Sequence, residues 1–124
     1  MNPYEASKKT ESLCRLAPVI PVLVVDDADI AQPLAEALIK GGLIVLEVTL
    51  RTPSALRVIS EMAKVQGGVV GAGTITKASD VTDAINAGAQ FGVSPGSTDD
   101  ILEACEQKKL PILPGAATSS EIMK

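Results

Sequence analysis

The stretch IVLEVTLRT, residues 44–52, decides how this chain is expected to fold. Its β-branched and leucine residues are typical of a buried strand, although Glu47 stands in its middle and Arg51 near its end. A run this apolar has no face suited to water, so we expect a central parallel strand that is covered on both faces. The rest of the chain should then supply partner strands and covering helices.

Four other apolar runs recur around this stretch at a nearly fixed spacing. The five strand runs are expected to begin near Val19, Ile44, Gly68, Gln90 and Pro111. Between them, apolar residues recur at intervals of three and four, which indicates amphipathic helices. The strand starts are 25, 24, 22 and 21 residues apart. One βα unit is therefore repeated without insertion, as in a (β/α)8 TIM barrel or a doubly wound sheet.

Polar residues and glycines mark the expected helix ends. The candidate capping residues are Asp27 or Asp29, Thr52 to Ser54, Ser79, and Thr98 to Asp100. Glycines suited to a left-handed residue follow the helices at Gly41-Gly42, Gly67-Gly68 and Gly88. A further helix is expected in the first fifteen residues, before the first strand.

The missing nucleotide motifs favour the barrel over the doubly wound sheet. No G-x-G-x-x-G follows the first strand, where Asp26 and Asp27 stand instead, and the chain has no P-loop. A barrel usually takes about 200 to 250 residues, so residues 1–124 are expected to form one domain holding only the first five βα units. Such an open half leaves strand edges and apolar faces unprotected, which predicts an oligomer rather than a monomer.

The composition excludes several kinds of partner and cofactor. A net charge of -4 without any Lys/Arg run argues against nucleic acid. The apolar runs are far shorter than the roughly 20 residues that cross a bilayer, and residues 1–15 lack a secretory signal, so no membrane partner and a cytoplasmic location are expected. The chain has no histidine and only two isolated cysteines, Cys14 and Cys105. We expect no metal or other cofactor, and both thiols should be small buried residues in helices.

Candidate functional residues lie where the expected strands end, because barrel enzymes carry their active sites at the carboxyl ends of strands. Glu47, Thr49 and Arg51 alternate and so share one face of their strand. A buried, charged and unpaired carboxylate costs several kcal/mol. Glu47 is therefore either a general acid or base with a raised pKa or one half of an internal ion pair with Arg51. In the first case Arg51 would hold an anionic substrate.

Three later strand ends are rich in small residues. They are Gly71 to Thr74, Ser94 to Gly96, and Pro114-Gly115. Small residues let a ligand approach the backbone, but tight βα turns need them too. These segments do not by themselves indicate a function.

Taken together, five motifs resemble the 2-keto-3-deoxy-6-phosphogluconate and 4-hydroxy-2-oxoglutarate aldolase family. They are VIPVLVV (19–25), GG-x-x-VLEVTLRT (41–52), VGAGT (70–74), AGAQFGVSPG (87–96) and PILPG (111–115). The resemblance runs from about Pro18 to Met123. It implies a class I aldolase on a (β/α)8 barrel, usually trimeric, which needs no metal. Such an enzyme cleaves a phosphorylated sugar acid of the Entner–Doudoroff pathway to pyruvate and an aldehyde through a lysine Schiff base.

The resemblance also implies roles for individual residues. Glu47 corresponds to the general acid/base, Arg51 and Thr74 to residues that hold the pyruvate carboxylate, and Pro95 to the pocket lining. In the family, the Schiff-base lysine lies on the sixth strand and the phosphate site in later loops, both beyond this chain. Lys124 is expected to be an exposed helical residue, so the chain alone is expected to be inactive.

Two alternatives to a working aldolase stay open at this point. The missing lysine also suits a non-catalytic, truncated or engineered half-barrel that serves as an oligomeric assembly module. Another barrel enzyme acting on a phosphorylated sugar is the second alternative, since one fold hosts many chemistries. The LEVTLRT segment, residues 46–52, argues against this last reading.

Overall fold

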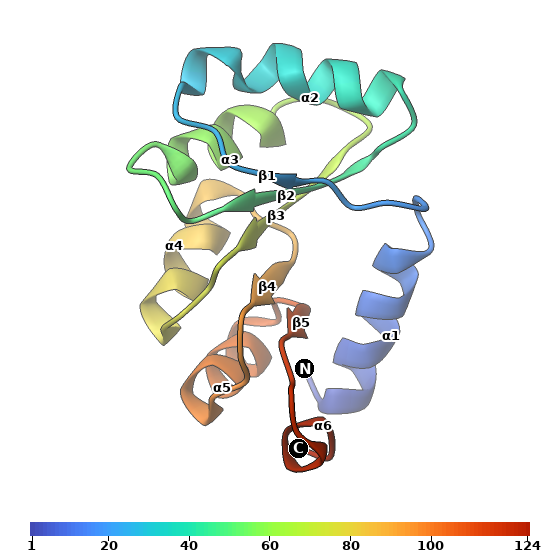
Figure 1. Cartoon of the computed structure of the whole chain (residues 1–124), viewed down its shortest axis with the longest axis vertical. Coiled ribbons are helices and arrows are strands. Elements are labelled where there is room, and N and C mark those ends of the chain that lie inside the picture. Colours follow the sequence, from blue (N-terminus) through green and yellow to red (C-terminus); the bar gives the residue numbers. More distant parts are fainter.

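A five-stranded parallel sheet forms the centre of the computed structural model, which describes residues 1–124 (Figure 1). Its strands lie in chain order: β1 (Val22–Leu23), β2 (Val45–Thr49), β3 (Val69–Gly73), β4 (Gly92–Ser94) and β5 (Ile112–Pro114). All four neighbouring pairs are parallel. Each strand begins within three residues of its predicted start. The predicted alternation of parallel strands and helices is thus confirmed.

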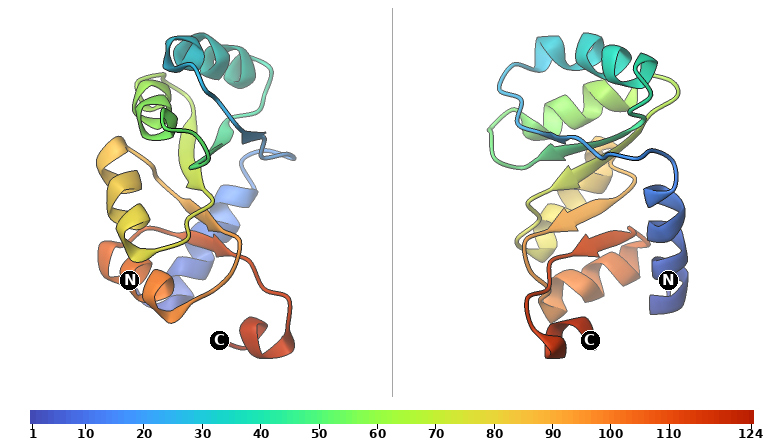
Figure 2. Two further views of the ribbon diagram at one scale, coloured as in Figure 1. Left: turned by 60° about the vertical axis from the view of Figure 1, so that its left-hand side comes forward. Right: turned by 45° about the vertical axis from the view of Figure 1, so that its right-hand side comes forward.

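Helices alternate with these strands. They are α1 (Pro3–Cys14), the 3-10 turn η1 (Ala28–Ile30), α2 (Ala31–Lys40), α3 (Ala55–Ala63), α4 (Ala78–Ala87), α5 (Asp99–Lys108) and α6 (Ser119–Ile122). The helices from α2 to α5 pack side by side along the sheet, whereas α1 stands apart from them beside β5 (Figures 1 and 2). None of the helices is long and apolar enough to cross a bilayer.

Most of the predicted helix ends are confirmed, and one cap is wrong. Asp27 accepts a hydrogen bond of 2.9 Å from the Asp29 backbone at the start of η1. Gly88 ends α4 with a left-handed φ of 104°. Ser79, however, lies inside the first turn of α4, whose N-cap residue is Lys77, and the carboxylate of Asp80 accepts the Thr76 and Lys77 backbone N–H groups at 2.9 and 3.3 Å. Asp80, at the third helical position, reaches back to the N-cap backbone and so fixes the N-cap at Lys77, two residues before Ser79.

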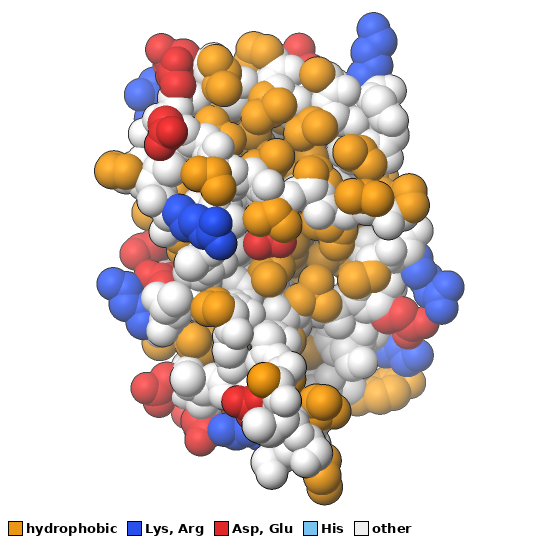
Figure 3. All heavy atoms as spheres, viewed as in Figure 1, with side chains coloured by type: hydrophobic (Ala, Val, Ile, Leu, Met, Phe, Trp, Pro, Cys, Tyr) orange, Lys and Arg blue, Asp and Glu red, His pale blue; other side chains and the backbone are white.

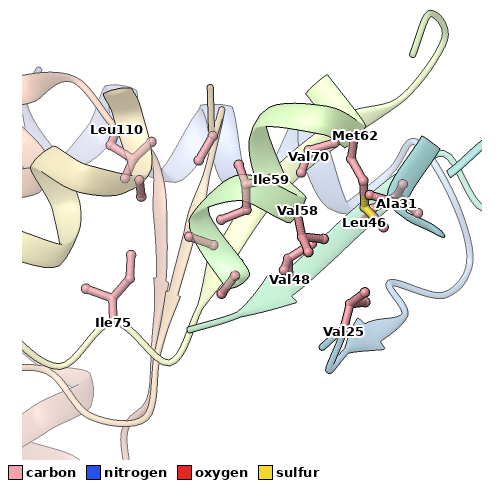
Figure 4. Close-up of a cluster of buried hydrophobic side chains, with 14 of the residues drawn as sticks. Val25, Ala31, Leu46, Val48, Val58, Ile59, Met62, Val70, Ile75 and Leu110 are labelled. Carbon is pink, nitrogen blue, oxygen red and sulfur yellow. The ribbon is translucent and has the colours of Figure 1, made fainter. Parts of the chain in front are cut away.

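The main core fills the space between the sheet and the helices. Val58, Ile59 and Met62 of α3 are fully buried against β2 and β3 (Figure 4). Leu46 and Val48 project from β2 into this cluster. Since successive residues of a strand point to opposite faces, Val45, Glu47 and Thr49 must project from the other face, away from these helices.

That second face, called here the inner face, is only partly covered. Leu13 of α1, Val45 and Phe91 are buried together there. The part of this face beside β1 is uncovered, and the side chains of Val22 and Val24 there are 60% and 53% exposed. Figure 3 shows hydrophobic side chains gathered over this part of the molecule. The prediction that the strands are covered on both faces is therefore wrong for β1, where no element lies over the inner face.

The two cysteines differ in their surroundings. Cys105 of α5 is buried as predicted, and burial raises the pKa of its thiol to about 11. Cys14 is exposed, so the prediction of a buried thiol is wrong there. Its neighbour Leu13 takes the single buried position of α1, and successive helical residues cannot both face the sheet.

The packing of α3 yields a first prediction. Ile59→Ala removes a fully buried side chain and should lower the free energy of unfolding by about 2 to 5 kcal/mol, because it leaves a cavity. Leu56→Ala, on the same helix but 37% exposed, should cost less than about 1 kcal/mol. Urea unfolding followed by circular dichroism measures both. Equal losses would contradict the orientation of α3.

Candidate functional site

Glu47 is a carboxyl group in the middle of a buried strand. Its side chain is only 8% exposed, and it makes no hydrogen bond or ion pair within the chain. Burial raises the pKa of the Glu47 carboxyl above its ordinary value, and the positive charge of Arg51 offsets part of that rise. The alternative of an internal Glu47–Arg51 ion pair is thus wrong. An isolated carboxyl with a raised pKa is suited to proton transfer.

The other three predicted residues follow neighbouring strands directly. Arg51 lies in the turn after β2, is exposed, and has no partner for its guanidinium within the chain. Thr74 is the first residue after β3 and is half-buried, and Pro95 is the first residue after β4 and is exposed. All three therefore stand at the carboxyl ends of their strands, as predicted.

Backbone hydrogen bonds tie these strand ends together into one rim. The Leu50 N–H donates to the Gly73 carbonyl at 2.9 Å, which places the turn with Arg51 beside Thr74. The Ile75 N–H in turn donates to the Val93 carbonyl at 3.1 Å, just before Pro95. Arg51, Thr74 and Pro95 thus leave the sheet from adjacent positions.

Thr74 has an unusual backbone. Its φ is 61°, in the left-handed region that β-branched residues rarely adopt. Such conformations cost of the order of 1 to 3 kcal/mol and cluster at functional sites. The sequence does not predict this strain, because glycine or asparagine is the usual residue in a left-handed conformation and position 74 is a threonine.

Thr49 shares the face of Glu47 but has a structural role. Its hydroxyl donates to the Leu23 carbonyl at 3.0 Å. Thr52 makes the equivalent bond of 2.9 Å to the Val25 carbonyl. These two bonds attach the short strand β1 and the loop after it to β2, and each hydroxyl uses its single proton in doing so.

The positive charge that acts on Glu47 comes from Arg51 and not from a lysine. All eight lysine side chains are exposed, and none belongs to a strand. Lys124 is exposed as predicted, but it lies beyond the end of α6, so the prediction that it is helical is wrong. Its ammonium group forms an ion pair with Asp99 at the start of α5. The chain also holds no group of three or more Cys, Asp or Glu side chains that could bind a metal ion.

A cavity of about 530 Å³ lies elsewhere, between α1, α5, β5 and α6. The amino group of Met1 donates to the Glu106 carbonyl at 3.1 Å on its margin. Its lining is largely apolar and includes Leu102, Leu110 and Ile112. None of the four predicted site residues borders this cavity, so it is distinct from the rim.

Fold and site together define a class: a run of βα units from a parallel barrel, with a lone buried carboxyl and an arginine at the carboxyl ends of the strands. The family model of KDPG and KHG aldolases matches residues 10–124. The chain belongs to this family.

Curated relatives agree with this assignment. The chain is 51% identical over 113 residues to the 2-dehydro-3-deoxy-phosphogluconate aldolase of Zymomonas mobilis, covering 91% of this chain and 54% of the relative. It is 45% identical over 114 residues to the KHG/KDPG aldolase of Escherichia coli, with the same two coverages. The chain thus spans about half the length of these relatives. Their names do not favour the alternative of a non-catalytic assembly module.

Solved structures support the fold. The Zymomonas mobilis 2-keto-3-deoxy-6-phosphogluconate aldolase superposes with a TM-score of 0.88 at 51% identity, over 91% of this chain and 55% of that one. The KDPG aldolase of Legionella pneumophila, solved with pyruvate captured at low pH as a covalent carbinolamine, gives 0.86 at 42% identity, over 90% and 55%. The five βα units seen here are therefore part of a TIM barrel.

The raised pKa of Glu47 predicts how stability depends on pH. The folded chain holds this proton more tightly than the unfolded chain, so stability is lost as the pH rises from the ordinary value of 4.5 towards the raised pKa. Glu47→Gln should therefore melt at a higher temperature than the unchanged chain at pH 7, and the gap should close below pH 4.5.

Thermal unfolding across this pH range measures the effect. Glu103→Gln, on the exposed side of α5, is the matched control and should show no such pH-dependent gap. A lower melting temperature for Glu47→Gln at pH 7 would indicate that the carboxylate has a stabilising partner.

Proposed function

We propose that this chain is the amino-terminal portion, one domain of residues 1–124, of a class I aldolase. The reaction is the reversible cleavage of 2-keto-3-deoxy-6-phosphogluconate, and of 4-hydroxy-2-oxoglutarate, to pyruvate and an aldehyde. The observation that carries this proposal is the isolated, buried Glu47 carboxyl beneath a rim that presents an unpaired Arg51. The names of the Zymomonas and Escherichia relatives supply the substrate.

Arg51 and Thr74 would bind the pyruvate carboxylate. A guanidinium group presents paired N–H donors that match a carboxylate, and such charge-assisted bonds are roughly twice as strong as neutral ones. Arg51 has no internal partner to release before it binds. The hydroxyl of Thr74 lies on the adjacent strand end, and Pro95 would close the next side of the pocket with an apolar ring.

Glu47 would move protons during C–C cleavage. A general acid or base works best when its pKa lies near the operating pH, and burial shifts the pKa of Glu47 in that direction. Its carboxyl has no hydrogen-bond partner in the chain, so both oxygens are available to the substrate. Proton transfer and carboxylate binding are therefore assigned to β2 and its turn.

The Schiff-base lysine would come from outside residues 1–124. A lysine nucleophile needs a lowered pKa and a place beside the keto carbon. The eight lysines here are exposed and lie off the strands. We accordingly propose that residues 1–124 are inactive alone, and that the phosphate group is also bound by later loops. The whole enzyme would be a cytoplasmic homo-oligomer, a trimer by family resemblance.

Reductive trapping tests the proposal that the Schiff-base lysine lies outside residues 1–124. A chimera joins residues 1–124 to the part of the Zymomonas mobilis aldolase beyond the matched region. In the chimera, a lysine amine should condense with the pyruvate carbonyl, releasing water, and borohydride should reduce the imine to a stable secondary amine. Intact mass should show one adduct on the chimera and none on residues 1–124. An adduct on the short chain would contradict the assignment.

The role of Arg51 gives a further prediction in the same chimera. Arg51→Met should raise KM for the sugar acid about 10- to 100-fold, because it removes charge-assisted hydrogen bonds of about 1.5 to 3 kcal/mol. Arg57→Met is the matched control, since Arg57 is an exposed arginine of α3 paired with Asp29. Steady-state assays with a pyruvate-coupled readout measure both. Equal changes of KM in the two variants would show that Arg51 does not bind the substrate.

A further inference from the structure

Two glycines occupy alternate positions on β3, opposite the strand that carries Glu47. Gly71 pairs in register with Glu47, and Gly73 pairs with Thr49. Because alternate residues share a face, both glycines lie on the inner face together with Glu47. The inner face of β3 therefore bears no side chain at these two positions.

Each glycine is covered by a side chain from a neighbouring strand. A Cβ atom on Gly71 would collide with the ring of Phe91, the residue directly before β4. A Cβ atom on Gly73 would collide with Oε1 of Glu47 and would lie 2.8 Å from Cδ and 2.9 Å from Cγ. The carboxyl of Glu47 thus rests directly on the backbone of β3.

The backbone conformation does not require glycine at position 73. The glycines with positive φ are Gly42, Gly67 and Gly88, and Gly73 is not among them. An L-residue could therefore adopt this backbone without strain, and a strand is normally weakened by glycine. Glycine marks a place where another group approaches the backbone closely, and here that group is a carboxyl.

We propose that Gly73 is a positioning residue that holds the Glu47 carboxyl on β3, below the rim formed by Arg51 and Thr74. A side chain at position 73 would push the carboxyl off the sheet towards the uncovered part of the inner face beside Val22. There the group would be solvated, and it would no longer point at a substrate bound at the rim. The inference rests on the proposed proton transfer by Glu47, and its geometric part can be tested without catalysis.

The direct test is the titration of Glu47 in Gly73→Ala, followed by NMR on residues 1–124 with 13C-labelled glutamate carboxyls. The Glu47 resonance is assigned by its absence in Glu47→Gln. We expect its titration midpoint to fall from the raised value towards that of an ordinary glutamate, because the displaced carboxyl is hydrated. An unchanged midpoint in Gly73→Ala would overturn the proposal.

Two other glycine substitutions serve as controls. Gly71→Ala should lower the unfolding midpoint by displacing Phe91 while leaving the Glu47 titration in place. Gly96→Ala adds a methyl group in open space at the same end of the sheet and should change neither quantity. A shift of the Glu47 titration in all three variants would show a general loosening of the sheet and would overturn a specific role of Gly73.

A double-mutant cycle keeps the proposal testable if Gly73→Ala is too unstable for NMR. The loss in denaturation midpoint caused by Gly73→Ala should vanish in a Glu47→Ala background, where the space is free, and persist in Glu47→Gln, which keeps the bulk. Equal losses in both backgrounds would contradict the collision. If this cycle holds but the chimera is not trapped by borohydride, the proposed function fails and the geometric inference stands.

Discussion

The structure depends on one constraint, which is that a carboxyl group must fit inside a strand whose every residue is buried. β2 pairs with strands on both sides and packs against α3, so the backbone of Glu47 is fixed in the sheet and its side chain must be accommodated on the inner face. It is accommodated because β3 has no side chain at Gly73. Without hydrogen bonds or an ion pair, the group keeps a raised pKa rather than a stabilised charge. The same cost that makes Glu47 unfavourable for folding makes it suitable for proton transfer.

The two faces of the sheet have different roles: one packs against the helices and stabilises the fold, and the other carries the proposed functional residues. The helices from α2 to α5 cover one face with a large apolar cluster, which fixes the strands and their register. The inner face carries a small apolar floor around Phe91 and, above it, Glu47. The rim with Arg51 and Thr74 lies beyond Glu47, at the carboxyl ends of the strands. An apolar floor, a buried carboxyl and a polar rim are thus stacked from the amino to the carboxyl ends of the strands, where barrel enzymes act.

Much of this arrangement could be predicted from the sequence, because it follows from local patterns. The strands, the helices and the alternation that brings Glu47 and Arg51 to one side of β2 are properties of short segments. Contacts between segments were missed. Three features depend on how distant segments pack: the cover of the inner face, the exposure of Cys14 on α1 and the fit of Glu47 on Gly73. Paired glycines at alternate positions of a strand beside a buried carboxyl are the signal that would have found the last of these.

A crystal structure of the chimera with pyruvate trapped at low pH tests the roles of Glu47 and Arg51 most directly. We expect the pyruvate carboxylate to bind at the rim, within hydrogen-bonding distance of the Arg51 guanidinium and the Thr74 hydroxyl. The Glu47 carboxyl should still lie on Gly73 and face the bound molecule. Pyruvate bound away from the rim, for example in the cavity between α1 and α5, would contradict these roles.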